Sequence, residues 1–396
     1  MPTTSTAAFP DPKLGEPFLL TPGPLTTAFS VKEAMLRDWG SWDADFRAMT
    51  KSVCDQLVAL AGDTKGDFVC VPMQGSGSYC VESMLGTFVP KDGKVLVLAN
   101  GAYGLRAAET MRYIGRAYTL IDKGDYMPPR GDEVGAALDA DPSITHVIAI
   151  HCETSSGILN PVAEISEAVY ARGRKLLVDS MSAFGAVDLD VNRIRYEAMV
   201  SSANKCIEGV PGFGFVIARK TELEAAKGNC HSLSLDVHAQ WANMVKSGQW
   251  RYTPPTHVVA AFLEALRLHA EEGGVPARGA RYARNRDVMV AGMRELGFET
   301  LLKDRWLSPI IVTFFCPADP NFVFTRFYDL MKSKGFIIYP GKLTVVDSFR
   351  IGVIGRMDEH IMRSVVAAAK ESLTEMGVAN AAPPAAALAE RAKLAA

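Results

Sequence analysis

Short apolar runs alternate with stretches of helical spacing through the first two thirds of this chain. The strand-like runs, rich in Val, Ile and Leu, are residues 95–98, 146–150 and 175–178. The stretches with helical spacing are residues 79–88, 102–114 and 162–172. Continuous apolar strands separated by helices are typical of a mainly parallel sheet that is covered on both faces. We therefore predict an α/β fold built on such a sheet.

Beyond residue 256 the pattern changes to two long helices followed by mixed strands and helices, which predicts a smaller α+β domain. We place a large domain at residues 18–265 and a small C-terminal domain at residues 266–376. Residues 1–17 are rich in Pro, Thr and Ala and are expected to form a flexible arm. Residues 377–396, rich in Ala and Pro, are expected to form a flexible tail.

Composition excludes several classes of protein. The 42 Lys and Arg residues nearly balance the 44 Asp and Glu residues, so neither nucleic acid nor a membrane surface is expected as a partner. The seven cysteines are widely spaced without a C-x-x-C pair, so we predict no disulfide framework and no metal site. This cysteine usage, together with a start that does not resemble a signal peptide, favours a cytoplasmic location.

Two short blocks carry the strongest indication of chemistry. The first, residues 176–182, is an apolar run that stops at the carboxylate of Asp179. The second, residues 200–206, contains Lys205, 26 positions after Asp179 and just before a glycine-rich run. In a pyridoxal phosphate enzyme a lysine forms a Schiff base with the cofactor and an acid keeps the ring nitrogen protonated. We therefore predict Lys205 and Asp179 as the catalytic pair.

Each of these two residues also has an ordinary explanation when taken alone. A carboxylate after a strand is often a helix N-cap, and most lysines are solvated at the surface. In open α/β sheets, however, ligands bind at the carboxyl ends of strands, where Asp179 is expected. The small residues on both sides of Lys205 leave room for a cofactor. The combination of the two residues favours the cofactor interpretation.

A glycine-serine turn at residues 74–78 precedes a predicted helix. Backbone N–H groups at the start of a helix can hold a phosphate with the help of the helix dipole. The dinucleotide-binding fingerprint is absent, because Cys80 stands where its third glycine would be. Taken alone, such a stretch is more often an ordinary turn than a phosphate-binding site.

Tyr103 and Arg350 are further candidates, each with two open interpretations. Tyr103 follows a predicted strand and can either stack on a flat ring or form the edge of the core. Arg350 lies within an apolar strand, where a guanidinium group needs an anionic partner. That partner is either a structural carboxylate or the acid group of a substrate.

Together these motifs resemble the class V aminotransferases of fold type I. Within that family the chain is most similar to the transaminases that transfer the amino group of 2-aminoethylphosphonate to pyruvate. The resemblance extends from about residue 18 to residue 375. The matching stretches are residues 19–27, 74–79, 100–104, 153–157, 178–182, 201–207, 209–213, 231–235, 252–257, 338–342 and 349–352.

The resemblance implies the pyridoxal phosphate-dependent transferase fold type I and a homodimer with active sites partly shared between subunits. It also implies roles for residues beyond Lys205 and Asp179. The implied cofactor contacts are Ser76, Gly77 and Ser78 at the phosphate, Tyr103 stacked on the ring, Thr154 at the ring hydroxyl, and Thr253 reaching the phosphate of the other subunit. Arg350 and Gly23 are implied as substrate-binding residues.

The reaction that the resemblance implies is transamination of 2-aminoethylphosphonate with pyruvate, which gives phosphonoacetaldehyde and L-alanine in phosphonate degradation. An alanine–glyoxylate or serine–pyruvate transaminase is the alternative within the same family. A catalytically inactive regulator that binds pyridoxal phosphate is a third possibility. Such a regulator is expected to carry a DNA-binding helix-turn-helix extension, for which the short N-terminal arm leaves no room.

Overall fold

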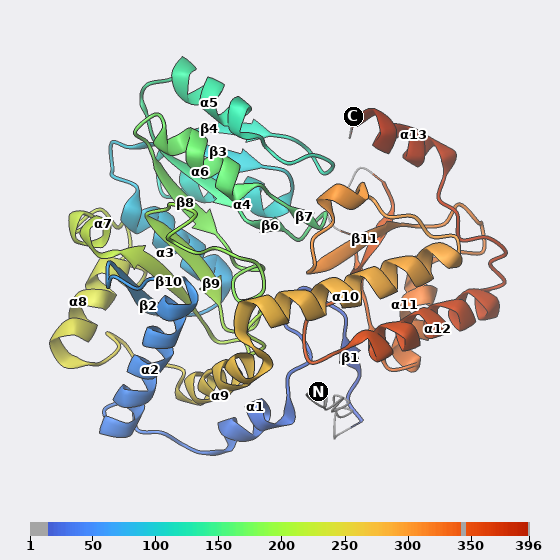
Figure 1. Cartoon of the computed structure of the whole chain (residues 1–396), viewed down its shortest axis with the longest axis horizontal. Helices are drawn as coiled ribbons and strands as arrows, with labels where there is room; N and C mark the ends of the chain where they lie inside the picture. The colour runs from blue at the N-terminus through green and yellow to red at the C-terminus, as the bar shows by residue number, and fades with distance from the viewer. Residues whose placement is uncertain (1–14, 342–345, 395–396) are drawn as a thin grey trace, which may run out of the picture.

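The computed structural model describes residues 15–341 and 346–394, which form a large and a small part joined by the long helix α10 (Gly274–Glu295) (Figure 1). Most of the expected N-terminal arm, residues 1–14, lies outside the described residues.

A seven-stranded sheet with the order β2-β10-β9-β8-β5-β3-β4 forms the centre of the large part. The strands from β9 to β4 in this order are parallel, whereas β10 is antiparallel to both of its neighbours. The bounds are Phe68–Gln74 (β2), Lys94–Ala99 (β3), Ala117–Asp122 (β4), Ile144–Ile150 (β5), Lys175–Asp179 (β8), Ala198–Ser202 (β9) and Phe213–Arg219 (β10). The predicted α/β fold with a mainly parallel sheet is confirmed.

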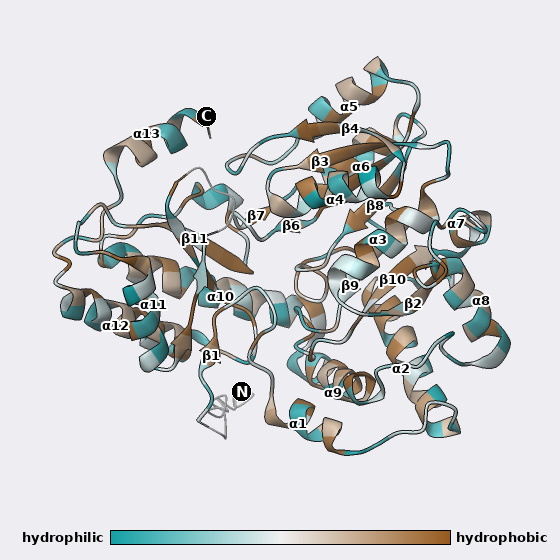
Figure 2. Ribbon diagram, turned by 180° about the vertical axis from the view of Figure 1, so that it is seen from behind, coloured by the Kyte–Doolittle hydropathy of each residue, from teal (hydrophilic) through white to brown (hydrophobic). Residues whose placement is uncertain are grey.

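Helices cover both faces of this sheet, which is why its strands are apolar throughout. The consecutive residues Leu96 and Val97 of β3 are both fully buried, but in hydrophobic clusters on opposite faces. Figure 2 shows β3 and β10 as mostly hydrophobic, whereas the covering helices mix both colours. One face packs against α2 (Ala44–Leu60), α5 (Gly131–Ala140), α6 (Val162–Tyr170) and α9 (Thr256–Glu272); the other packs against α3 (Gly77–Phe88), α4 (Ala102–Tyr113), α7 (Lys220–Ala225) and α8 (Val237–Ser247).

The small part contains a three-stranded antiparallel sheet with the order β11-β14-β13 and a separate parallel pair, β1 and β12. Phe349 of β14 lies at the centre of its core, with ring centroids 5.8 Å from Phe314 and 5.6 Å from Phe298. The strand bounds are Phe18–Leu19 (β1), Ile311–Phe315 (β11), Phe336–Ile337 (β12), Tyr339–Pro340 (β13) and Ser348–Gly352 (β14). The helices are α11 (Phe324–Ser333), α12 (Glu359–Met376) and α13 (Ala385–Leu394).

The shorter elements are the helix α1 (Phe29–Glu33), the 3-10 turns Ala34–Leu36 and Asp304–Trp306, and the hairpin of β6 (Cys152–Glu153) and β7 (Ile158–Leu159). The hairpin follows β5 and brings the segment from Glu153 to Ser155 to the edge of the sheet where the strands end.

The division into two parts differs from the predicted boundaries of 18–265 and 266–376 at two points. Strand β1 pairs with β12, so Phe18 and Leu19 belong to the small part although they come first in the sequence. Helix α9 stays with the large core beyond residue 265, since Leu266 is buried in that core and His269 is hydrogen-bonded to the Gly185 carbonyl at 2.6 Å. The change of core therefore falls at Gly273, between α9 and α10.

The C-terminal segment also differs from the flexible tail that the sequence analysis expects at 377–396. In the structure, residues 377–394 run along the small part, with Ala381 and Ala387 buried in its core. Arg391 Nη1 donates a hydrogen bond of 2.6 Å to the Thr300 carbonyl. Alanine is small enough to pack closely, so a segment with the composition of a linker can still be held against a domain.

Within residues 15–341 and 346–394, no helix is both long enough and apolar enough to cross a membrane. No group of three or more His, Cys, Asp or Glu side chains in these residues is arranged to hold a metal ion.

Candidate active site

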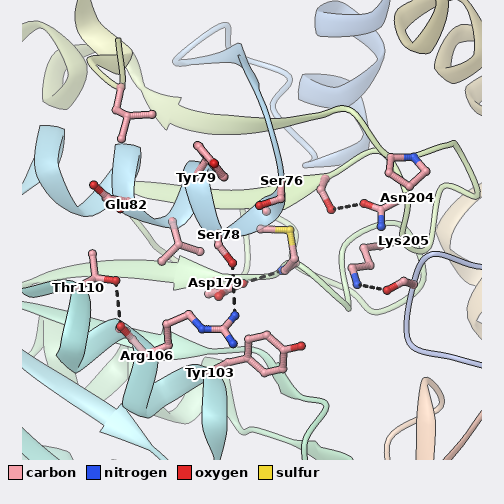
Figure 3. Close-up of a pocket in the computed structure, with 18 of the residues that line it drawn as sticks. Ser76, Ser78, Tyr79, Glu82, Tyr103, Arg106, Thr110, Asp179, Asn204 and Lys205 are labelled. Carbon is pink, nitrogen blue, oxygen red and sulfur yellow. Dashed lines mark hydrogen bonds between the residues drawn. The ribbon is translucent and has the colours of Figure 1, made fainter. Parts of the chain in front are cut away.

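A cavity of about 750 Å³ lies beside the carboxyl ends of β8 and β9, in the size range of small-molecule sites (Figure 3). It contains seven of the ten residues that the sequence analysis assigns to the site. These seven are Gly23, Ser76, Gly77, Ser78, Tyr103, Asp179 and Lys205.

Lys205 reaches the cavity from the loop that follows β9. Its Nζ donates hydrogen bonds to the carbonyl oxygens of Pro22 at 2.8 Å and Gly23 at 3.2 Å. Burial lowers the pKa of Lys205 to about 8, although the negative charge of Asp179 opposes the fall. A lysine with this pKa has a substantial neutral fraction near pH 8, and only the neutral amine can act as a nucleophile or accept a proton.

Asp179 is the last residue of β8 and is 5% exposed. Burial raises the pKa of its carboxyl group to about 6, while a hydrogen bond of 2.9 Å from the Met181 N–H opposes the rise. A buried carboxylate of this kind gains most from a cationic group placed beside it. It therefore fits the protonated nitrogen of a heterocycle that enters the cavity.

The glycine-serine turn lies at the start of α3, where Ser76 precedes the first helical residue, Gly77. The first N–H groups of a helix have no partner within the helix, so this turn offers donors to an anion in the cavity. Arg106 lines the same cavity, and its Nη1 donates a hydrogen bond of 3.3 Å to Ser78 Oγ. Its guanidinium carbon lies 5.0 Å from the centre of the Tyr103 ring.

Arg106 is one of two site residues that the sequence analysis missed. It lies three positions after Tyr103 on a predicted helix, and this spacing places both side chains on one face. The spacing was therefore the signal that could have identified it.

The second missed residue is Glu153, whose carboxylate is completely buried at the start of α4. It accepts hydrogen bonds from the N–H groups of Tyr103 at 3.0 Å and Gly104 at 3.2 Å, and from Ser155 N–H at 3.1 Å. Burial raises the pKa of Glu153, and these donors oppose the rise. Glu153 thus holds the turn that carries Tyr103, and nothing in the local sequence indicates this distant contact.

Arg350 and Thr154 are close to each other but are not among the residues that line the cavity. Arg350 Nη1 donates a hydrogen bond of 2.8 Å to the Thr154 carbonyl, and its Nε donates to the Pro340 carbonyl at 3.0 Å. The guanidinium carbon is 5.0 Å from the centre of the Tyr339 ring. Arg350 is thus a buried cation that connects the small part to the hairpin beside the cavity.

Thr253 does not line the cavity of its own chain. It lies on an exposed loop, and its carbonyl accepts a hydrogen bond from Gln74 Nε2.

A parallel sheet with a lysine and a carboxylate at its strand ends, joined to a smaller α+β part, is the architecture of an aminotransferase. The chain belongs to the class-V aminotransferase family, whose model matches residues 78–318. The family predicted from the sequence motifs is confirmed.

Two relatives match the chain over nearly its full length. The 2-aminoethylphosphonate–pyruvate transaminase of Rhizobium meliloti (strain 1021) is 77% identical over 383 residues, which are 97% of this chain and 100% of the relative. The 2-aminoethylphosphonate–pyruvate transaminase 1 of Paraburkholderia xenovorans (strain LB400) is 69% identical and covers 97% of this chain and 99% of the relative.

Among solved structures, the pyridoxamine-pyruvate aminotransferase from Mesorhizobium loti matches with a TM-score of 0.83. The match covers 92% of this chain and 94% of that protein at 23% sequence identity. At this identity the likeness establishes the fold, and it agrees with the fold type predicted from the sequence.

The first prediction concerns Gly23, which has a φ of +109°. A Cβ atom there would lie 2.6 Å from the Asn204 carbonyl oxygen and 2.7 Å from Lys205 Nζ. Gly23→Ala should therefore displace the amine and lower kcat/KM about 10- to 100-fold, because small displacements of reacting groups have effects of this size. Steady-state kinetics measures this.

Gly335→Ala is the matched control. Gly335 has a φ of +90°, but no described atom lies within 4 Å of its added Cβ. The Gly335→Ala variant should be less stable, because alanine adopts this backbone conformation at a cost, but it should keep its activity. Equal activity of the two variants would contradict the proposed contact between Gly23 and the amine.

The second prediction concerns the stability cost of Lys205. Its folded-state pKa of about 8 lies below the value of about 10.4 expected in the unfolded chain. Burying the charged amine therefore lowers the free energy of unfolding at pH values below 8. This loss of stability shrinks as the pH rises above 8 and is gone above about 10.4, where the amine is neutral in both states. Lys205→Met should raise the Tm of the cofactor-free protein at pH 7 and raise it much less at pH 10. A gain independent of pH, or no gain, would show that the amine is not destabilised by burial.

Proposed function

We propose that the protein is a pyridoxal phosphate-dependent transaminase that converts 2-aminoethylphosphonate and pyruvate into phosphonoacetaldehyde and L-alanine. The observation that carries the proposal is the pairing of Lys205 and Asp179 across one cavity in a chain that is 77% identical to a transaminase of that name. The identity covers the whole length of that relative, so both parts of the fold and the cavity between their elements are included.

The residues around the cavity fit the cofactor at four points. The amine of Lys205 can bind its aldehyde carbon, and the buried carboxylate of Asp179 can pair with its ring nitrogen. The amide groups at Gly77 and Ser78, together with Arg106, offer donors to its phosphate. Tyr103 provides an aromatic face for its ring, as predicted from the sequence.

Pyridoxal phosphate supplies an electron sink that disperses the negative charge left when a substrate carbon loses its proton. The chain supplies the proton transfer. With the cofactor bound, the free amine of Lys205 would accept the proton from the substrate carbon and return it nearby, because burial lowers its pKa to about 8 and only its neutral form can take up a proton. The carboxylate of Asp179 would stay ionised beside a cationic ring nitrogen and would favour the protonated form of that nitrogen.

Recognition of the acid group is assigned to Arg350, as the sequence analysis expects. Its guanidinium group is rigidly held by the carbonyls of Thr154 and Pro340, and burial lowers its pKa, although arginine remains charged in proteins. A buried guanidinium group that is hydrogen-bonded to neutral carbonyls binds an anion strongly, and the acid group of the substrate would supply that anion. Gly23 contributes by leaving the space next to the Lys205 amine open.

The first test uses Lys205→Ala and a panel of amino donors. The variant should lose transamination almost completely, because it lacks both the attachment point and the proton carrier. The wild-type enzyme should form alanine from pyruvate faster with 2-aminoethylphosphonate than with serine as the amino donor, and faster than it transfers the amino group of alanine to glyoxylate. Coupled assays for alanine and for aldehyde measure both. Preference for serine would favour the alternative transaminase, and an active Lys205→Ala variant would contradict the mechanism.

We further propose that the protein is a homodimer whose subunits share their active sites. Three large apolar side chains at or near the cavity are exposed: Tyr79, which lines it, at 57%, Leu233, two residues before the lining residue Leu235, at 74%, and Tyr252 at 45%. Exposed apolar groups that cluster in this way mark interaction surfaces. Thr253 follows Tyr252, is exposed and does not line the cavity of its own chain, as expected for a residue that serves the other subunit.

Analytical ultracentrifugation tests the dimer. A mass close to twice the 42.8 kDa of one chain is expected. Replacing Leu233 by Asp should shift the protein toward the monomer and lower its activity, whereas replacing the distant exposed Val323 by Asp should do neither. An active monomer would rule out shared sites.

We also propose a cytoplasmic location. All seven cysteines have free thiols in the structure, and Cys152 and Cys206 are completely enclosed or nearly so. Free thiols of this number are typical of proteins from a reducing compartment.

A further inference from the structure

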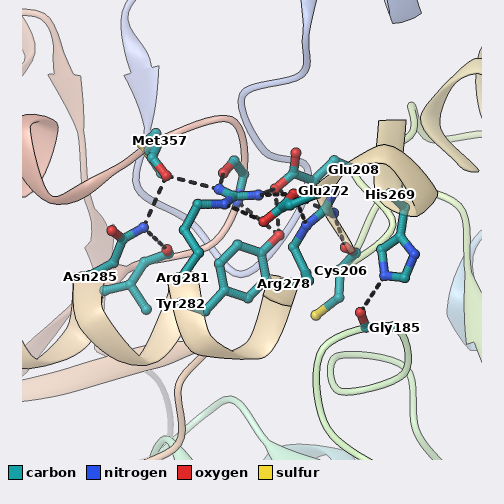
Figure 4. Close-up of polar contacts among 12 residues, drawn as sticks. Gly185, Cys206, Glu208, His269, Glu272, Arg278, Arg281, Tyr282, Asn285 and Met357 are labelled. Atoms are coloured by element: carbon teal, nitrogen blue, oxygen red, sulfur yellow. Dashed lines mark hydrogen bonds and ion pairs between the residues drawn. The ribbon is translucent and has the colours of Figure 1, made fainter. Parts of the chain in front are cut away.

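A buried cluster of charged side chains lies at the start of α10, behind the loop that carries Lys205 (Figure 4). We call it the α10 cluster. Its members, none of which is among the residues found to line the cavity, are Glu208, Glu272, Arg278, Arg281 and Tyr282.

Glu208 has an unusual backbone conformation. Its φ is +63°, and it is the only non-glycine residue with a positive φ within 15–341 and 346–394. Its N–H donates a hydrogen bond of 2.7 Å to the Lys205 carbonyl and so closes the turn that begins at the lysine. Residues other than glycine adopt this conformation only where their surroundings impose it, most often at functional sites.

The side chain of Glu208 explains why glycine is not used at this position. Its Oε1 accepts hydrogen bonds from Arg281 Nη2 at 2.8 Å and from Tyr282 Oη at 2.6 Å, and Arg278 Nη1 lies 3.5 Å away. Arg278 also donates to the Cys206 carbonyl, so the loop is held at two points. Burial would raise the pKa of Glu208, but the two guanidinium charges outweigh burial and hold it below its ordinary value.

The same helix holds the segment that follows Arg350. Arg281 Nη1 donates hydrogen bonds to the carbonyls of Gly355 at 2.6 Å and Met357 at 2.8 Å, and Asn285 Nδ2 donates to the Val353 carbonyl at 3.1 Å. Figure 4 shows these contacts continuing from those of Glu208 along one side of α10.

Residues 352–357 in turn hold the segment whose carbonyls accept the hydrogen bonds of the Lys205 amine. The N–H of Arg356 donates to the Thr26 carbonyl at 2.8 Å, and the N–H of Gly352 donates to the Leu20 carbonyl at 2.9 Å. Pro22 and Gly23, which receive the hydrogen bonds of Lys205 Nζ, lie between these two anchors. The α10 cluster therefore contacts the lysine loop directly, and it is linked to the segment that accepts the amine through residues 352–357.

We propose that Glu208 is a positioning residue for Lys205: held by Arg278, Arg281 and Tyr282, it fixes the loop so that the amine meets the cofactor and substrate in one geometry. Stability alone explains the cluster poorly, because buried ion pairs are often no more stabilising than apolar side chains of similar volume. A fixed geometry for a reacting group, in contrast, requires directional contacts of this kind.

This inference rests on the proposed function in one respect, namely that Lys205 carries the cofactor. The experiment therefore begins with the cofactor-free enzyme and follows the attachment of pyridoxal phosphate to Lys205 by absorbance, with borohydride trapping and peptide mapping to identify the lysine. Glu208→Gln retains the size of the side chain and removes its charge. It should slow attachment by about tenfold or more and lower kcat by a similar factor, since displacement of a reacting group has effects of this order. KM for pyruvate should change by less than about threefold.

Glu197→Gln is the matched control. Glu197 is 5% exposed, as is Glu208, and it accepts a hydrogen bond of 2.7 Å from the Leu176 N–H. It lies next to the start of β9, at the opposite end of the strands from Asp179. Its loss should lower stability yet leave the attachment rate within about twofold of the wild type, because it removes a buried carboxylate without touching the lysine loop.

Tyr282→Phe is the second variant and removes one donor to Glu208 without changing any charge. Its control is Tyr196→Phe, a fully buried tyrosine whose hydroxyl donates to the Leu189 carbonyl at 3.3 Å. If Glu208→Gln does not fold, this second pair decides. Slower attachment in Tyr282→Phe than in Tyr196→Phe supports the positioning role.

Three outcomes separate the proposals. If the wild type attaches the cofactor at Lys205 and only the variants of the α10 cluster are slow, the inference is supported. If the wild type attaches it and Glu208→Gln behaves as Glu197→Gln does, the positioning role is wrong while the proposed function stands. If the folded wild type attaches no pyridoxal phosphate at Lys205, the proposed function fails, and the inference fails with it.

Discussion

A lysine amine loses its hydration when it enters a protein interior, and the fold must replace the water that it loses. At Lys205 the replacement is partial. Two backbone carbonyls, those of Pro22 and Gly23, accept its hydrogen bonds, and the carboxylate of Asp179, whose charge acts on the amine, is itself buried. The amine therefore keeps a lowered pKa of about 8, which makes it reactive near neutral pH.

The sheet of the large part brings Asp179 and Lys205 together, and contacts from the small part hold them in place. Asp179 ends a parallel strand, and Lys205 follows the end of the neighbouring strand, so the sheet alone brings both to the same edge. The small part then closes over this edge, with Arg350 anchored to the Thr154 carbonyl. The carbonyls that receive the Lys205 amine belong to a segment that begins in the small part. The lysine is thus defined by contacts from both parts of the chain.

Local patterns in the sequence were sufficient to predict the sheet and to single out Lys205 and Asp179, which the structure places at one cavity. A strand buried on both faces is apolar throughout, as at residues 95–98, and a carboxylate that ends such a strand stands out. Contacts between residues far apart in the sequence produce no local pattern, so they could not be predicted in this way. Glu208 is 70 residues or more from the arginines that hold it, and the two residues of β1 are too few to show a period. The role of Glu153 was missed for the same reason, since its partners at the start of α4 lie about 50 residues earlier.

The central claim is that one buried amine, that of Lys205, carries the cofactor opposite Asp179. Its most direct test is borohydride reduction of the purified protein after incubation with pyridoxal phosphate, followed by mass mapping of the peptides. The account predicts a single pyridoxyl group on Lys205, and a pH dependence of attachment that follows an amine with a pKa of about 8. Modification of a different lysine, or none at all in the folded protein, would contradict it.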